Sequence, residues 1–363
     1  MKPETSVFLD LVRFCAALAV ACDHIVDYTN GFLWQVGAMI GVFGPQAVDV
    51  FFVLSGYVIA YAVTNRESDV IQYAVSRCAR LYSVVLPALI IAYVLGIIGS
   101  MMRPEVNWGD TSLIAYFRCL TFTNQLWLSN LTPGNDSPFW SLGYEAWYYL
   151  IFAAAYFGKG TWRIVLTLLC VAAAGPRIMV MFPLWLMGVA AWVLATRITC
   201  AKFRAGLIWC GCMALTGALV GWQLTRVISG AEVEIAAPWR TMANWGAFSA
   251  DYGVGLLAAL SFLSFNLSAE YWTKLARIIQ KPVRWLAGAT FTLYLLHVPV
   301  AQFLGAISPW PIGTLPEQTL VVAGTFAIVF LVAEYTERRK SAWRNAIASV
   351  LRRRSKAPAE HPL

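Results

Sequence analysis

The stretch of sequence that decides the fold is VFLDLVRFCAALAVACDHIVDY, residues 7–28. It is apolar and long enough to cross a bilayer as a helix, since about 20 residues span the hydrocarbon core. Yet it contains Asp10, Arg13, Asp23, His24 and Asp27, and a charged side chain at the bilayer centre costs at least about 2.5–3.5 kcal/mol. A polar face kept at this cost indicates a functional site inside the membrane.

Arg13 and His24 lie on the same face of this helix. They are eleven residues apart, which brings them to within about 20° of each other around the axis and separates them by about 16 Å along it. We therefore expect this face to line the active site of a membrane enzyme. Asp10 and Arg13 also interrupt the apolar run, so we expect the helix to be retained rather than cleaved as a signal peptide.

The composition places the chain among polytopic all-α membrane proteins. Its 363 residues are 59% hydrophobic and only 13% charged, whereas soluble domains are about 25% charged. The net charge of +8 does not indicate nucleic-acid binding, because most Lys and Arg residues sit in short loops and in the tail, where they set membrane orientation. The eight cysteines show no zinc-binding spacing, so we interpret them as small hydrophobic residues and expect no metal.

Apolar windows predict about ten transmembrane helices, near residues 7–28, 44–64, 81–102, 138–157, 162–175, 178–196, 205–228, 246–265, 284–307 and 317–336. The fifth span is cut short by Gly175-Pro176, which leaves a helical hairpin or a broken helix open. Both termini are predicted to be cytoplasmic, because the opposite side then holds only Arg103, Arg118, Arg177, Arg226 and Arg240.

The last apolar window ends near residue 336, so we divide the chain into a membrane domain, residues 1–337, and a basic cytoplasmic tail, residues 338–363. We expect the tail to be disordered beyond Arg354. Residues 103–137 are expected to form an outer loop with an interfacial or re-entrant helix. Residues 266–284 are expected to form a basic amphipathic helix on the inner surface.

Histidines are the obvious candidates for a general base. Neutral imidazole accepts protons near pH 7, and for His24 either Asp27, one turn on, or Asp23 could orient the ring. His297 lies in the predicted ninth span, where a structural role bonding another helix and a catalytic role both stay open.

The second span opens with Gly44-Pro-Gln-Ala-Val-Asp49 and continues to Ser55-Gly56-Tyr57. Ser55-Gly56 allows another helix or a ligand to approach closely, and helix packing alone explains it well. Asp49 is an intramembrane carboxylate without an adjacent partner in the sequence, and such a group is by default a candidate for function.

Two further pairs have the spacing of a shared helix face. Arg77 and Arg80 lie three residues apart and would bracket one anionic group such as a phosphate, or else contact lipid headgroups. Glu145 follows Ser141 by one turn in the predicted fourth span. An uncompensated carboxylate in the membrane is costly, so we expect Arg13, Arg118 or a substrate hydroxyl to be its partner.

Taken in order, these motifs resemble acyltransferase family 3, the integral-membrane acyltransferases that modify surface polysaccharides and other acceptors. The resemblance rests on five motifs spread over residues 6–336: Arg13 with ten residues to His24, the Asp49-to-Tyr57 segment, Arg77-x-x-Arg80, Trp140-Ser141-Leu142-x-x-Glu145, and Tyr294-Leu-Leu-His297-x-Pro299.

The resemblance implies acyl-CoA as the donor, acetyl-CoA in the first place, with His24 as the essential base and with Arg13, Arg77 and Arg80 around the donor. It also implies a glycan or lipid-linked glycan acceptor, a place in the bacterial cytoplasmic (inner) membrane, and contact with membrane lipid. In the scheme we expect, Tyr57 or Ser141 stabilises the oxyanion. The protein would act alone, as a homo-oligomer, or with a partner protein.

A transporter or flippase is the main alternative. In that case Asp10, Arg13, His24, Asp49 and Glu145 would form a proton or substrate pathway. The two halves of the sequence show no repeat symmetry of the kind that many transporters have, which favours the enzyme. A non-catalytic scaffold is a third, weaker reading.

Overall fold

The computed structural model describes residues 1–228 and 245–356, and within these ranges it contains helices and loops but no β-strand. Its α-helices are α1 (Pro3–Ile25), α2 (Phe32–Gly41), α3 (Gly44–Asn65), α4 (Val70–Met102), α5 (Leu113–Leu120), α6 (Trp140–Phe157), α7 (Gly160–Ala174), α8 (Pro176–Met179), α9 (Phe182–Arg197), α10 (Lys202–Ile228), α11 (Trp245–Ser268), α12 (Thr273–Ala287), α13 (Thr290–Ile307), α14 (Leu315–Tyr335) and α15 (Lys340–Lys356). Short 3-10 helices are η1 (Val26–Tyr28), η2 (Ser137–Phe139), η3 (Ala269–Trp272) and η4 (Glu337–Arg339).

The prediction of an all-α, multi-span membrane protein is confirmed. In the described part of the chain, eight helical stretches are long and apolar enough to cross a membrane: Pro3–Tyr28, Gly44–Asn65, Val70–Met102, Pro176–Arg197, Lys202–Thr225, Ala250–Ala287, Thr290–Ile307 and Leu315–Ser349. The predicted fourth and fifth spans correspond to α6, which is not among these eight, and to α7, an apolar helix of 15 residues.

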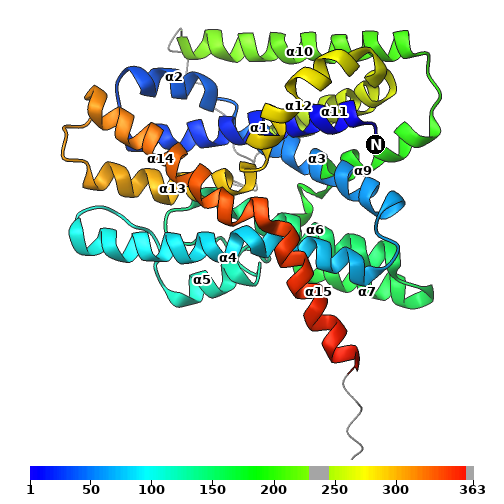
Figure 1. Ribbon diagram of the computed structural model, residues 1–363, viewed down its shortest axis with the longest axis horizontal. Helices are drawn as coiled ribbons and strands as arrows, with labels where there is room; N and C mark the ends of the chain where they lie inside the picture. Colours follow the sequence, from blue (N-terminus) through cyan, green and yellow to red (C-terminus); the bar gives the residue numbers. More distant parts are fainter. Residues whose placement is uncertain (229–244, 357–363) are drawn as a thin grey trace, which may run out of the picture.

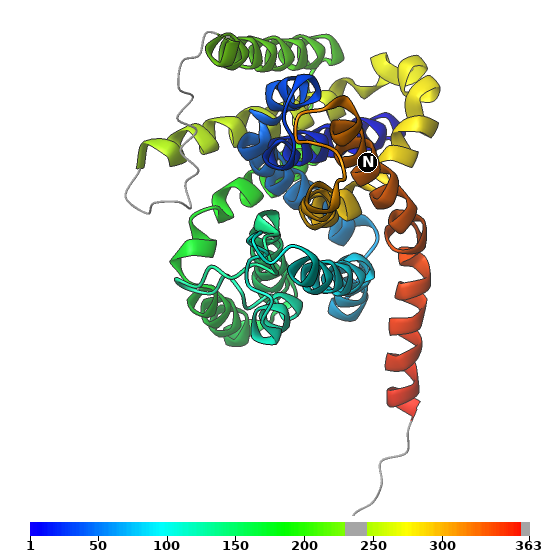
Figure 2. The same ribbon diagram turned by 90° about the vertical axis from the view of Figure 1, so that its left-hand side faces the viewer.

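Helices α1 and α3 occupy the middle of the molecule (Figures 1 and 2). They pack against each other, and α1 also packs on α12 and α13 while α3 packs on α9 and α11. Helices α4 to α7 form a group on one side of this centre, and α10 lies at the opposite edge. The predicted first and second spans are therefore the elements around which the other helices assemble.

The predicted ninth span, residues 284–307, is wrong at its start. The chain forms two helices there, because α12 ends at Ala287 and α13 begins at Thr290. The new helix start is stabilised by Glu337, whose Oε2 accepts hydrogen bonds from the backbone N–H groups of Phe291 at 2.9 Å and Thr292 at 3.0 Å. A carboxylate favours a helix N-terminus because it pairs with N–H groups that have no partner within the helix.

Helix α2 was not predicted. It lies across α1 with Gly37 and Gly41 at the contact, and a Cβ atom at Gly41 would come within 2.5 Å of the Asp23 Cα. Two glycines four residues apart let two helices approach this closely. The Gly37-x-x-x-Gly41 spacing is the signal that could have indicated this helix.

The two predicted loop helices are present. The loop of residues 103–137 contains α5, and residues 269–287 form η3 and the amphipathic α12, which buries Ala276, Val283 and Ala287 and exposes Lys274 and Arg277. In the predicted tail, α15 is helical to Lys356, and residues 357–363 lie outside the described residues, as does Arg240.

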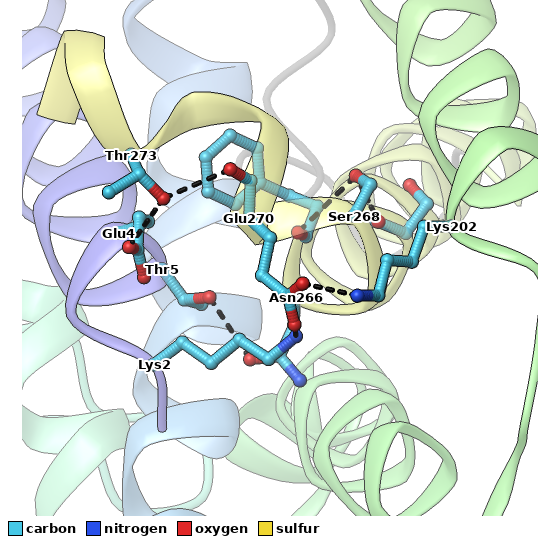
Figure 3. Close-up of polar contacts among 10 residues, drawn as sticks. Lys2, Glu4, Thr5, Lys202, Asn266, Ser268, Glu270 and Thr273 are labelled. Carbon is cyan, nitrogen blue, oxygen red and sulfur yellow. Dashed lines mark hydrogen bonds and ion pairs between the residues drawn. The ribbon is translucent and has the colours of Figure 1, made fainter.

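A polar network fastens the start of α1 to the 266–273 segment (Figure 3). Glu270 forms ion pairs with Lys2, at 3.3 Å, and with Lys202 at the start of α10. Thr5 donates to Asn266 at 3.0 Å. The first turns of α1 and α10 are thereby held at the same end of the molecule, next to the cavity described below.

Candidate functional site

A cavity of about 980 Å³ lies between α1, α3, α4, α6, α13 and α15. Its lining follows α3 from Val48 to Arg66, which is about 27 Å of helix at 1.5 Å per residue. Ligand sites in proteins commonly enclose about 300–1,000 Å³. The cavity is therefore long and large enough to hold an extended molecule.

Three of the predicted cationic residues line this cavity. Arg13 forms an ion pair with Asp10, at 3.1 Å between Nη1 and Oδ1. Arg77 forms a shorter ion pair with Glu67, at 2.6 Å. Arg80 has no carboxylate within 4.0 Å among the described residues, so its guanidinium is available to an anionic ligand in the cavity.

Glu145 is held in the cavity wall by hydroxyl groups. Its Oε1 accepts hydrogen bonds from Ser55 Oγ, at 2.6 Å, and from the Tyr149 hydroxyl. Arg118, one of the partners expected from the sequence, instead donates to the carbonyl oxygen of Thr123 at 2.7 Å. The carboxylate is thus fixed in position by α3 and by its own helix.

Two hydroxyl groups mark one end of the cavity. Ser141 Oγ and the Tyr294 hydroxyl are 2.7 Å apart and hydrogen-bonded, and Tyr294 is the last residue of α13 that lines the cavity. One turn further along α13, the ring of His297 lies edge-on to the ring of Tyr294, with 6.4 Å between their centroids. The cavity therefore stops where a buried histidine begins.

His24 and His297 form a pair just beyond this end, with ring centroids 5.4 Å apart. Each ring bonds through Nδ1 to the carbonyl oxygen four residues earlier, Val20 or Leu293, at 2.8 Å. A carbonyl oxygen only accepts, so in the neutral rings Nδ1 carries the hydrogen and Nε2 is an unprotonated acceptor. Asp27, expected to orient His24, is exposed in η1, and the Nδ1 contact is made by Val20.

Two other sequence candidates lie away from the cavity. Tyr57 is fully buried, packs edge-on against Trp192 and Phe262, and has no hydrogen-bond partner for its hydroxyl among the described residues. Asp49 is 1% exposed and lies close to the carboxyl group of Asp251 on α11. In the described ranges, no three His, Cys, Asp or Glu residues are grouped to hold a metal ion.

Sequence reasoning missed several charged residues of this region. Glu67 and Glu337 line the cavity, and so do Lys340 and Arg344 of α15. Lys340 and Arg344 lie one helical turn apart, a spacing that places two cations on one face and that could have drawn attention to the tail. Nothing in the sequence pairs Asp251 with Asp49, because they lie on helices that meet only in the fold.

Asp136 is a buried carboxyl group in the loop before α6. It is 2% exposed, and its Oδ1 has no hydrogen-bond partner among the described residues. Burial raises the pKa of Asp136 well above its ordinary value of 3.8, since a low-dielectric environment disfavours the charged form. This group is therefore held in its neutral form over a wider pH range than an exposed aspartate.

Comparison with known proteins identifies the family. A family model described as an acyltransferase domain matches residues 6–334. This range includes the histidine pair and every residue that lines the cavity, except Met1 and those after α14. No solved structure matches the chain significantly.

Two curated relatives are acyltransferases by name. The acyltransferase MdmB of Streptomyces mycarofaciens is 34% identical over 152 residues, which cover 40% of this chain and 38% of the relative. The peptidoglycan O-acetyltransferase OatA of Listeria monocytogenes is 25% identical over 367 residues, which cover 91% of this chain and 54% of the relative. The chain thus spans about half the length of OatA, and the MdmB match covers less than half of either protein.

Proposed function

Because the chain belongs to the acyltransferase domain family, we propose that it transfers an acyl group, in the first place acetyl, from acyl-CoA to a hydroxyl group of a bacterial surface or secreted glycan. Its membrane spans and its relatives, which are acyltransferases by name, support this proposal. The donor, the acceptor, the place in the bacterial cytoplasmic membrane and the roles of individual residues are the proposed part.

The observation that carries the proposal is the cavity that begins among arginines and ends beside the histidine pair. Arg13, Arg77 and Arg80 line it, and guanidinium groups bind phosphate strongly and directionally. The closed end carries the Ser141 and Tyr294 hydroxyls. This arrangement suits a donor with a phosphorylated head and a long flexible arm. The head would bind among the arginines, and the thioester would lie at the two hydroxyls.

His24 would act as the general base. Its Nε2 is the unprotonated nitrogen, so it accepts the proton of the acceptor hydroxyl while that oxygen bonds to the acyl carbon. The carbon–sulfur bond of the thioester then breaks, and the proton passes from His24 to the departing sulfur. Holding both reactants in one site removes much of the entropic barrier of a bimolecular reaction.

The oxyanion donor would be the pair of hydroxyls at the cavity end. Ser141 and Tyr294 share one hydrogen bond, so a hydroxyl hydrogen of this pair can turn toward the oxygen on which negative charge develops. Tyr57, the other donor expected from the sequence, is packed among aromatic rings away from the cavity. We therefore assign this role to Ser141 and Tyr294 instead of Tyr57.

The experiment uses the full chain in membrane vesicles given radiolabelled acetyl-CoA. We expect alkali-labile label to appear in the glycan fraction with the natural sequence. The His24→Ala variant should lose at least about 100-fold in rate, as expected for loss of a general base, while eluting as a folded protein in detergent.

Normal transfer by folded His24→Ala protein would contradict the mechanism. Solute counterflow without consumption of acetyl-CoA would contradict the enzyme itself and support the transporter alternative. Mass spectrometry of surface glycans with and without the gene would identify the acceptor among lipopolysaccharide, exopolysaccharide and lipochitooligosaccharide. The name of OatA adds peptidoglycan to the acceptors tested.

A further inference from the structure

One face of α15 belongs to the cavity wall. The lining residues of this helix are Lys340, Ser341, Arg344, Asn345 and Ala348. Their spacing, one and four residues apart, is that of a single helix face. The part of α15 that packs on α4 therefore presents two cations and two uncharged polar groups to the cavity.

The cavity carries more positive than negative side chains. Six cationic side chains line it against four carboxylates, and the carboxylates are Asp10, Glu67, Glu145 and Glu337. Each carboxylate already has a protein partner. Asp10 and Glu67 form ion pairs with arginines. Glu145 accepts hydrogen bonds from hydroxyl groups, and Glu337 caps α13. The unneutralised charge is left on the remaining cations of the wall.

Those remaining cations are Arg66, Arg80, Lys340 and Arg344, none of which has a carboxylate within 4.0 Å among the described residues. Lys340 is close enough to Arg80 to interact with it electrostatically. The two cations repel each other, and Glu337 and Asp10 act on both only from beyond ion-pair distance, so the arrangement favours a bound anion.

Three of these cations, Arg66, Lys340 and Arg344, lie toward the end of the cavity opposite the hydroxyl pair, and Arg80 lies further in. Arg66, which directly follows α3, lines the cavity about 27 Å along the helix axis from Val48. Helix α15 begins beside the α13 cap and leads away from the body of the protein (Figures 1 and 2). Arg344 and Lys340 are exposed there, within reach of a ligand in solvent.

We propose that α15 is part of the donor site, with Lys340 and Arg344 binding the phosphate groups of the acyl-CoA nucleotide. The tail would then make the protein select a phosphorylated nucleotide thioester over a bare pantetheine thioester. This inference rests on the proposed function. It adds a second group of cations at the cavity mouth to the three arginines further in.

The test compares three donors with the full chain in phosphatidylcholine nanodiscs: acetyl-CoA, acetyl-3′-dephospho-CoA and acetyl-pantetheine. The Lys340→Gln/Arg344→Gln variant should raise the KM for acetyl-CoA by about 10- to 100-fold, the usual effect of losing charge-assisted hydrogen bonds. Its kcat and its KM for acetyl-pantetheine should stay unchanged.

The matched control is Lys274→Gln/Arg277→Gln, which removes two exposed cations from α12 that do not line the cavity. This variant should keep the KM of the natural sequence for every donor. It corrects for any general effect of lowering the positive charge near the membrane surface.

Three results would overturn the inference alone, provided that the natural sequence still transfers the acyl group from acetyl-CoA. The first is an unchanged KM for acetyl-CoA in the α15 variant, and the second is an equal change of KM for all three donors. The third is an effect on KM that is seen only when phosphatidylglycerol is added to the nanodiscs, which would assign the two residues to lipid headgroups. If the natural sequence consumes no acyl-CoA at all, the proposed function fails as well.

Discussion

The buried carboxyl group of Asp136 should make the stability of the folded protein depend on pH. Its pKa is raised by burial, so above about pH 4 the unfolded chain releases a proton that the folded protein still holds. Stability then falls as pH rises toward the folded-state pKa, by up to about 1.4 kcal/mol per pH unit. Asp136→Asn removes this term, and we expect it to raise Tm at pH 8 more than at pH 4.5.

Thermal unfolding of the purified protein at the two pH values measures this difference. Glu105→Gln is the control, because Glu105 is an exposed carboxylate of the same loop. It should not show the Asp136→Asn pattern. A variant whose Tm falls by the same amount as that of the natural sequence between pH 4.5 and pH 8 would show that Asp136 does not carry the effect.

The crossing of α3 and α9 depends on two glycines. A Cβ atom at Gly188 would lie 1.8 Å from the carbonyl oxygen of Val53, and one at Gly56 would lie 1.9 Å from that of Trp185. The close approach predicted for Ser55-Gly56 is confirmed. Gly188→Ala must push the two helices apart, and we expect it to destabilise the protein by about 1–3 kcal/mol or more.

Gly217→Ala serves as the comparison for that substitution. Gly217 lies in α10, and a Cβ atom there would meet no described residue within 4 Å. Alanine is also the better helix former, by about 1 kcal/mol, so this variant should keep or raise the Tm. Equal losses of Tm in the two variants would contradict the role given to the α3–α9 contact.

For the molecule as a whole, the cavity brings the start of α1 close to α15, since Met1 and Ala348 both line it. The prediction that both termini face the cytoplasm can be tested directly. Reporter fusions to the N-terminus and the C-terminus should therefore give the same cytoplasmic signal. Reporters on opposite sides of the membrane would reject the predicted orientation and the assignment of the arginines to a cytoplasmic donor.

Much of this architecture could be predicted because membrane spans and intramembrane charges are local signals. The predicted helix of residues 7–28 is present as α1 and η1, and Arg77 and Arg80 share α4 and both line the cavity. The start of α13 at Thr290 could not be predicted, because it depends on a carboxylate from Glu337, far along the chain. The same holds for Asp251 beside Asp49, a contact made only when α3 and α11 pack.

Arg13 and His24 share one face of α1, but they lie in different surroundings in the fold. Arg13 lines the cavity and His24 does not. The hydroxyls of Ser141 and Tyr294 lie in the cavity wall, and the ring of Tyr294 contacts that of His297, the partner of His24. A donor held in the cavity is therefore not in direct contact with the base. We expect little idle hydrolysis of the donor, because His24, which would activate water, does not line the cavity that holds it.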